Sequence, residues 1–129
     1  MQLLKHSLLV FLGSGVGGMV RLLLNNFITG FAGSGFPWGI LTINVLGSTA
    51  IGLVAGWFAY RGDAAADMRL FLTTGILGGF TTFSAFSLDA TLLYERGQPG
   101  LAALYVVASV VLSLLGLAAA LWAVRLATP

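Results

Sequence analysis

The chain has 129 residues, of which 58% are hydrophobic and only 8% charged, and its mean hydropathy is +1.00. This balance excludes a soluble globular domain and is typical of an integral membrane protein. The absence of cysteine excludes disulfides and thiolate metal sites, and a single histidine excludes a His-rich metal site. A net charge of +2, carried by few residues, gives no reason to expect a nucleic-acid partner.

Four apolar segments are each close to the roughly 20 residues that a helix needs to cross the hydrocarbon core of a bilayer. They lie at about Ser7 to Phe27, Trp38 to Tyr60, Leu70 to Tyr94, and Leu101 to Val124. The first lacks a small-residue cleavage pattern, so we do not interpret it as a cleaved signal peptide. The sequence therefore predicts one all-α domain over residues 1–129, an integral membrane protein with four transmembrane helices.

The basic residues between the spans predict an orientation. If both termini lie on one side of the membrane, most basic residues lie there too: Lys5, Arg61, Arg69 and Arg125, against Arg96 on the other side. The positive-inside rule then favours, by a margin of few residues, an orientation with both termini in the cytoplasm.

Two polar residues interrupt the first two spans. Arg21 is flanked on both sides by membrane-like sequence, so it marks a functional or paired site, or it lies near enough to the end of its span to reach the interface. Asn44 lies near the centre of the second span, where an unpaired amide would cost roughly 2 kcal/mol or more. Its side chain must face protein, water or a ligand, and a hydrogen bond to another helix is the simplest of these.

Glycines at four-residue spacing predict close helix packing. Gly13 with Gly17 and Gly52 with Gly56 form small-xxx-small pairs, and Gly116 with Ala120 repeats the pattern in the last span. Ordinary packing between helices is the simplest interpretation. Because four spans enclose little volume, one chain is not expected to surround a water-lined path alone, and the sequence predicts a homo-oligomer.

The third span contains "GILGGFTTFSAF", Gly75 to Phe86, which predicts a helix broken near its middle. The Gly78-Gly79 pair weakens the helix, and Thr81-Thr82 can compete for backbone groups. Carbonyl groups released by such a break can bind a cation. Phe80, Phe83 and Phe86 share a face, either as a packing ridge or as ring edges that attract an anion, with the Thr82 and Ser84 hydroxyls among them.

The last span carries Tyr105, Ser109 and Ser113 at four-residue spacing, which places three hydroxyls on one helix face. Such a stripe predicts a polar track away from lipid. The alternatives are serines that bond back to their own helix and a tyrosine that anchors at the interface. Asp89 near the end of the third span is either a vestibule residue or a boundary charge.

The segments "GGMVR", "INVLGS" and "GILGGFTTFSAFS" together resemble the CrcB/Fluc family of small bacterial fluoride channels, and the resemblance covers essentially the whole chain. It implies a multi-pass protein of the bacterial inner membrane that lets cytoplasmic fluoride leave passively down its electrochemical gradient. It also implies an antiparallel, dual-topology homodimer with two pores and a structural sodium ion at the dimer interface.

The resemblance further implies a role for particular residues. For the fluoride pore they are Asn44, the rings of Phe83 and Phe86, the hydroxyls of Ser84 and Thr82, and the track of Tyr105, Ser109 and Ser113. The backbone carbonyls of Gly78 and Thr81 would bind sodium, and Arg21 would lie near the pore vestibule.

Two alternative functions fit parts of the sequence. A small multidrug exporter would need a carboxylate within the membrane, and the first, second and fourth spans contain no Asp or Glu. A non-transporting subunit of a membrane complex would explain the glycine packing but not a polar stripe beside a broken helix. No nucleotide-binding loop, catalytic triad or HExxH motif occurs, so an enzyme is not expected.

Overall fold

The structure is a computed structural model that describes residues 1–128, and every regular element in that range is helical. The order is α1 (Gln2–Ala32), α2 (Trp38–Phe58), the 3₁₀ turn η1 (Asp63–Ala65), α3 (Ala66–Leu70), the π-helix η2 (Phe71–Leu77), α4 (Gly78–Phe80), α5 (Phe83–Glu95) and α6 (Pro99–Ala127). Helices η1 to α5 together form the third of four segments long and apolar enough to cross a membrane. The predicted all-α protein with four spans is confirmed.

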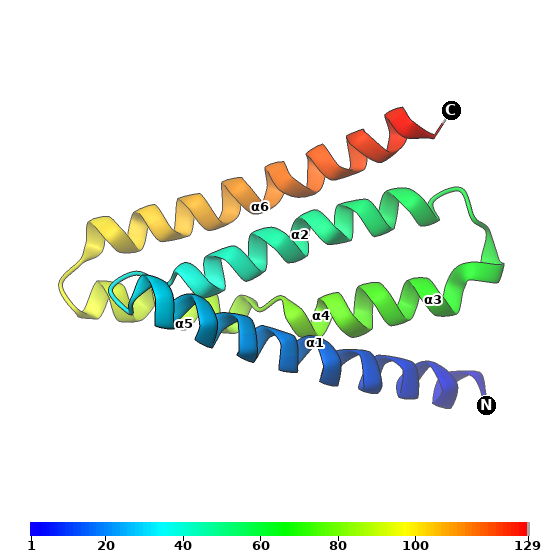
Figure 1. The fold of residues 1–129 in the computed structure, drawn as a ribbon, viewed down its shortest axis with the longest axis horizontal. Coiled ribbons are helices and arrows are strands. Elements are labelled where there is room, and N and C mark those ends of the chain that lie inside the picture. The colour runs from blue at the N-terminus through cyan, green and yellow to red at the C-terminus, as the bar shows by residue number, and fades with distance from the viewer. Residues whose placement is uncertain (129) are drawn as a thin grey trace.

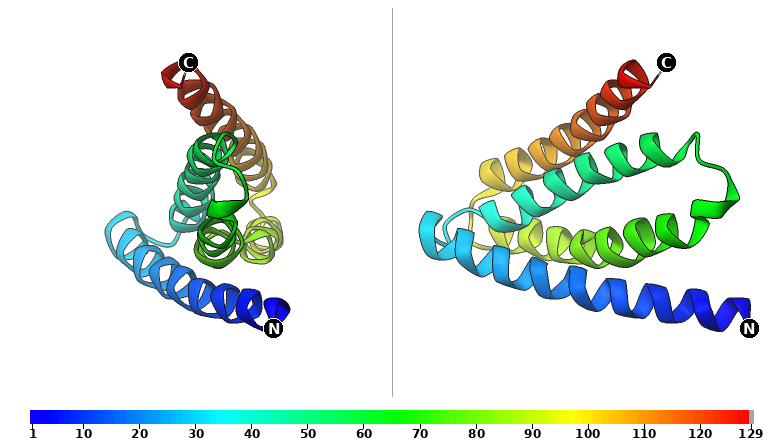
Figure 2. Two further views of the ribbon diagram at one scale, coloured as in Figure 1. Left: turned by 90° about the vertical axis from the view of Figure 1, so that its right-hand side faces the viewer. Right: turned by 45° about the vertical axis from the view of Figure 1, so that its right-hand side comes forward.

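The helices form two pairs that diverge toward one end of the molecule. Helices α2 and α6 lie side by side along their length, and α1 packs against the third span (Figure 1). The pairs converge at the end that holds the α1–α2 and α5–α6 connections, and both chain termini lie at the splayed end, as the rotated views show (Figure 2). An even number of spans places the two termini on the same side of a membrane.

Glycine allows both helix pairs to pack with their backbones in close contact. A Cβ atom added to Gly13 would lie 2.8 Å from the Gly75 Cα, and one on Gly56 would lie 2.9 Å from the Val124 Cβ. A Cβ on Gly17 would overlap the Ile76 carbonyl oxygen. The prediction that these glycines serve helix packing is therefore confirmed.

The break in the third span lies three residues beyond the glycine at which we expected it to begin. Gly78 is still helical, with φ −64° and ψ −38°, whereas Thr81 and Thr82 are extended, with ψ of 155° and 119°. Gly79 is used for packing instead, because a Cβ there would lie 2.7 Å from the Ser14 Cα. The threonines suit the extended backbone as β-branched residues, and Thr82 caps the next helix.

The backbone before the break is wound as a π-helix from Phe71 to Leu77, an element that the sequence did not lead us to expect. Such segments are rare, and they are frequently found near functional sites. This one packs along α1, and its Gly75 lies against Gly13. The third span is thus irregular over most of its first half, up to the extended residues at its centre.

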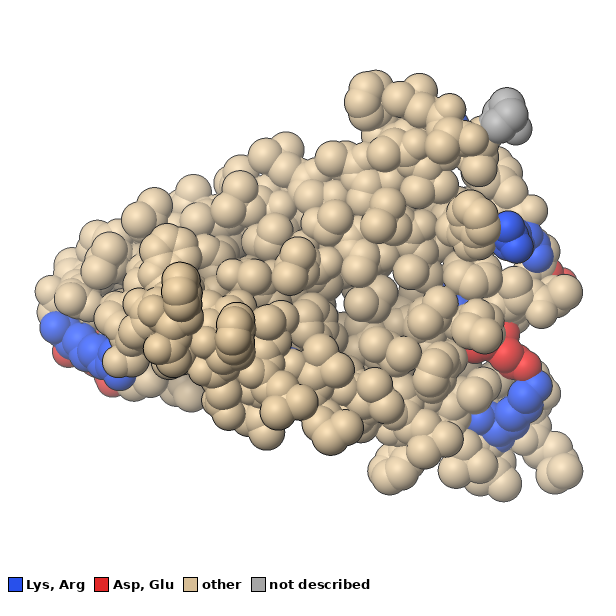
Figure 3. Space-filling model, in the orientation of Figure 1, with Lys and Arg blue, Asp and Glu red and all other residues tan. Residues whose placement is uncertain are grey.

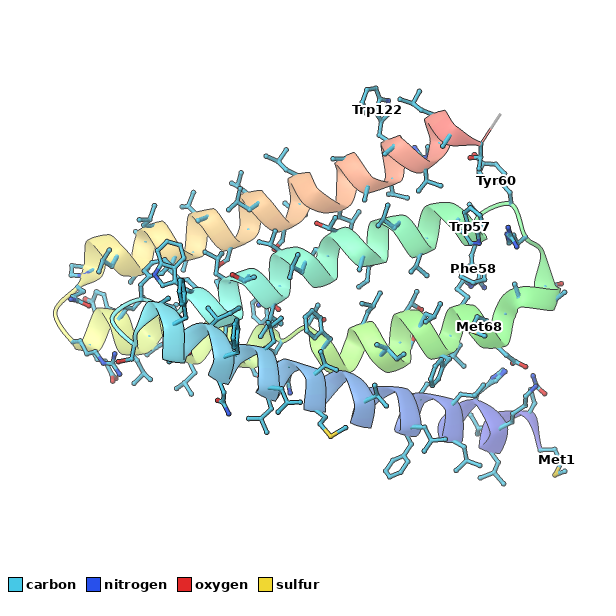
Figure 4. All side chains as sticks on the ribbon, in the orientation of Figure 1. Met1, Trp57, Phe58, Tyr60, Met68 and Trp122 are labelled. Atoms are coloured by element: carbon cyan, nitrogen blue, oxygen red, sulfur yellow. The ribbon has the colours of Figure 1, made fainter. Side chains whose placement is uncertain are left out.

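The outer surface is apolar, with charge at the two ends. Large hydrophobic side chains are exposed along every span, as expected for a surface that faces lipid. The charged side chains on the face shown in Figure 3 gather at the two ends and leave the middle apolar. Trp57, Tyr60 and Trp122 lie at the splayed end (Figure 4), where the Arg61 guanidinium stands 4.3 Å from the Trp57 ring centroid. Aromatic residues of this kind mark a membrane interface.

Candidate functional site

The amide of Asn44 joins α2 to the broken part of the third span. Its Nδ2 donates to the Thr82 carbonyl oxygen at 3.0 Å, and its Oδ1 accepts from the Thr82 backbone N–H at 2.8 Å. The backbone N–H and carbonyl of the extended Thr82 are therefore both hydrogen-bonded by one side chain from α2. The same two bonds pair the amide of Asn44, which explains why an asparagine is tolerated at membrane depth. Of the three surroundings that we considered for Asn44, protein is confirmed, and the partner is the extended Thr82 rather than a helix.

A cavity of about 330 Å³ opens between α2, the break, the start of α5 and the middle of α6. Its lining combines an amide, hydroxyl groups, aromatic rings and two aliphatic side chains: Asn44, Ser48, Thr81, Thr82, Phe83, Phe86, Ser109, Val110, Ser113 and Leu114. No carboxylate and no basic side chain belongs to this lining. The cavity therefore offers neutral hydrogen-bonding groups and aromatic rings rather than a fixed charge.

The hydroxyl stripe of α6 reaches the cavity with two of its three members. Ser109 is 5% exposed, and its buried Oγ has no hydrogen-bond partner within residues 1–128. Ser113 lies one turn further along and is half-buried. An unpaired buried hydroxyl is costly unless something else bonds to it, so the Ser109 hydroxyl leaves one hydrogen-bonding group unused at the wall of the cavity.

Tyr105, the third member of the stripe, lies just outside the lining and is completely buried. Its hydroxyl donates to Asp89 Oδ2 at 3.4 Å, and its ring centroid lies 5.3 Å from that of Phe86. A fully buried ring does not act as an anchor at the membrane surface, so that alternative is wrong. Tyr105 instead supports the wall of the cavity from behind Phe86 and links α6 to Asp89 on α5.

The two phenylalanines assigned to the pore both line the cavity, in different surroundings. Phe86 is 9% exposed, whereas Phe83 is 78% exposed, and their ring centroids are 5.4 Å apart at an interplanar angle of 51°. Phe80 is not part of the lining and packs near Gly47. The three rings therefore do not act as one ridge, because the break separates the first from the other two.

The hydroxyls around the break have different surroundings. Thr82 Oγ1 accepts from the Ala85 backbone N–H at 3.1 Å and so caps α5, while it also faces the cavity. Ser84 is exposed and outside the lining, and its Oγ lies 3.3 Å from Thr82 Oγ1. Within one chain, the structure thus brings Thr82 but not Ser84 to the cavity.

Arg21 also binds the break. One of its guanidinium nitrogens donates to the Thr81 carbonyl oxygen at 3.3 Å, across 60 residues of sequence. Of the two interpretations of Arg21, the paired site is the one that the structure supports. The charge lies beside the broken helix and not in the cavity lining, so it contributes a long-range field rather than direct contact with whatever the cavity holds.

The backbone groups needed for a cation site are present at the break. In a continuous helix the Thr82 N–H would donate to the Gly78 carbonyl, and the Ala85 N–H would donate to the Thr81 carbonyl. Here these two N–H groups donate to Asn44 Oδ1 and Thr82 Oγ1. Both carbonyls have lost their helical donors, and a carbonyl oxygen that binds Arg21 keeps a second lone pair. The break therefore supplies backbone oxygens of the kind that bind a monovalent cation, with the Thr81 oxygen shared with Arg21.

Fold and cavity define a small multi-pass membrane protein with a polar site at a broken helix. Residues 8–121 match the family described as "CrcB-like protein, Camphor Resistance (CrcB)", and the chain belongs to this family. The resemblance inferred from the three motifs is therefore confirmed.

Relatives match over nearly the full length. The chain is 56% identical over 121 residues to a protein of Rhodopseudomonas palustris (strain BisB5), which covers 94% of this chain and 98% of that protein. It is 57% identical over 118 residues to a protein of Nitrobacter hamburgensis, covering 92% and 95%. A protein of Agrobacterium fabrum is 51% identical over 106 residues, covering 82% and 85%. All three are named as fluoride-specific ion channels, FluC.

Ser48 lines the cavity one turn after Asn44 on α2, although it was not among the predicted site residues. The signal that would have found it is the four-residue spacing that we applied to Tyr105, Ser109 and Ser113 but not to the second span. The partners of Asn44 and Arg21 carried no such signal, because each bond joins segments far apart in the sequence.

Proposed function

We propose that this chain is a fluoride-specific ion channel of the bacterial inner membrane, through which cytoplasmic fluoride leaves passively. The observation that carries the proposal is the cavity at the broken helix, lined by neutral hydrogen-bonding groups and two aromatic rings at membrane depth. The names of relatives that match nearly the whole chain support it. Passive conduction requires no catalytic group, so we assign none.

The chemistry of the lining suits a small, strongly hydrated anion. A pore must replace the water shell of fluoride with short donors, and the cavity offers the Asn44 amide and the Ser109 and Ser113 hydroxyls. Phe83 and Phe86 present aromatic rings, whose edges carry partial positive charge. Several weak sites allow release, whereas a lysine in the cavity would hold the ion too tightly. A larger anion such as chloride gains less from these donors.

The pore is completed, we propose, by a second copy of the chain. The Phe83 ring is 78% exposed in one chain although it lines the cavity, so a partner surface is needed to enclose the path. An antiparallel, dual-topology homodimer would contain two such pores. Single cysteines introduced in the loop from Arg61 to Arg69 should react with a membrane-impermeant label from both sides of the membrane, and labelling from one side only would contradict this arrangement.

A sodium ion is the structural cofactor that we propose for the dimer. The Gly78 and Thr81 carbonyls would hold it, since both have lost their helical hydrogen-bond donors. The bound cation would neutralise these oxygens at membrane depth and stabilise the dimer. No group of three or more His, Asp or Glu residues within residues 1–128 is placed to bind a metal, so a divalent ion that requires carboxylates is not favoured.

Fluoride efflux from liposomes that contain only the purified chain tests the function. Rapid fluoride loss after the membrane potential is collapsed, with no comparable loss of chloride, is the expected result. Protein-free liposomes provide the background rate. Efflux at that background rate from a folded protein would refute the channel and leave the non-transporting subunit as the remaining interpretation. The residues that line the cavity contain no carboxylate, which disfavours a proton-coupled drug exporter.

A further inference from the structure

Ser48 lies in the cavity without a role in the sequence-based description of the site. It follows Asn44 by four residues on α2, so the two side chains share one helix face. It is half-buried and belongs to the lining, with Ser109 and Ser113 contributed by α6. The cavity therefore has polar groups on both of the helices that flank it.

The hydrogen-bond donors of the lining are fewer than its residue types suggest. Asn44 has two N–H groups, and one of them is bound to the Thr82 carbonyl. The Thr81 hydroxyl donates to the Leu77 carbonyl at 2.9 Å and so is occupied within its own segment. These two residues together leave one N–H for an ion, so further donors on the α2 side are needed to replace a water shell.

Ser48 differs in this respect from its neighbour Thr49. The Thr49 hydroxyl donates to the Val45 carbonyl at 2.8 Å, which is the usual arrangement of a hydroxyl inside a helix. Among the hydrogen bonds of residues 1–128, Ser48 has no such bond to its own helix. The Ser109 Oγ from α6 is likewise without a partner. The cavity thus contains hydroxyls on two helices that are not engaged by the protein.

We propose that Ser48 is a fluoride-binding residue, whose hydroxyl donates to the ion as it passes between Asn44 and the serines of α6. This inference rests on the proposed channel function and specifies its site. The free N–H of Asn44 and the Ser48 hydroxyl form a pair of donors on α2, and Ser109 and Ser113 line the same cavity from α6. Fluoride is then bound from both helices instead of from one polar stripe.

The test compares Ser48→Ala with Ser87→Ala in the fluoride efflux assay. Ser87 is a matched control because its hydroxyl donates to the Phe83 carbonyl at 2.9 Å, within its own helix, and it does not line the cavity. Ser48→Ala should lower the initial efflux rate about tenfold, the factor expected for one hydrogen bond to a charged group. Ser87→Ala should conduct like the parent.

Three outcomes separate the possibilities. A folded Ser48→Ala variant that conducts at the parent rate overturns the role of Ser48 and leaves the channel intact. A parent protein without fluoride efflux overturns the channel, and the role of Ser48 with it. If Ser48→Ala does not fold, Ser48→Cys replaces the hydroxyl by a weakly donating thiol, and parent-like efflux from that variant also overturns the proposal.

Discussion

The two halves of the third span differ in what they contact, although both lie within the same membrane-spanning segment. The first half, η2 and α4, packs against α1 through Gly75 and Gly79 with almost no side chain between the backbones. The second half, α5, contacts α6 through Phe86 and borders the polar cavity. The extended residues Thr81 and Thr82 between them let one span serve a packing partner on one side and a polar site on the other.

The largest effect is expected in the packing half. Gly17→Ala should prevent correct folding or lower the free energy of unfolding by about 3 kcal/mol, because the added methyl overlaps the Ile76 carbonyl and overpacking is not relieved by a backbone. The melting temperature of the protein in detergent is the measurement. Gly15→Ala is the matched control, since nothing lies within 4 Å of its added Cβ. Equal melting of the two variants would show that the contact with η2 is not tight.

A smaller effect on stability but a large effect on conduction is expected at Asn44. The carboxylate of Asn44→Asp can still accept from the Thr82 N–H but cannot donate to the Thr82 carbonyl or to an anion. Fluoride efflux should fall by roughly a hundredfold, because a like charge near the ion costs on the order of 1 to 4 kcal/mol. Efflux equal to that of the parent would place the path of the ion away from Asn44.

The exposed ring of Phe83 gives a cleaner test of the aromatic contribution. Phe83→Ile should lower fluoride efflux about tenfold, since Ile lacks the positive ring edge, a contribution on the order of 1 kcal/mol. The fold of the single chain should be unaffected, because Phe83 is 78% exposed there. Phe11→Ile, at a ring that is 73% exposed on α1, controls for the loss of an exposed aromatic residue. If both variants conduct like the parent, the Phe83 ring is a packing surface only.

The smallest effect is expected on α3, at the start of the third span and just before the half that packs against α1. Asp67 forms an ion pair with Lys5 and a contact of 3.2 Å with His6, all near the splayed end of the molecule. Asp67→Asn should leave fluoride efflux unchanged and the melting temperature nearly so, because exposed ion pairs contribute little and are screened by salt. A large loss of stability that disappears at high salt would show that this ion pair, and not glycine packing, holds α1 to the third span.

Sequence patterns predicted the spans well because membrane thickness and hydropathy constrain them locally. The position of the break was harder to predict, because a Gly-Gly pair has two possible roles. It can weaken a helix, or it can let a neighbouring helix approach closely, and the sequence of Gly78-Gly79 is the same in both cases. Only the contact between Gly79 and Ser14 distinguishes the two. The pairing of Arg21 with the Thr81 carbonyl depends on tertiary structure, and no spacing rule reaches across 60 residues. The roles of these residues toward fluoride and sodium remain predictions.

The double hydrogen bond between Asn44 and Thr82 also has a mechanical consequence. Asn44 belongs to α2, and α2 is interlocked with α6 where Gly52 and Gly56 meet Leu117 and Val124. The break is therefore attached to a closely packed two-helix unit, so α2, α6 and the break hold the cavity walls together. If the proposed second copy closes the path as firmly, we expect the pore to discriminate by ionic radius, because walls that do not relax would not accommodate a larger anion.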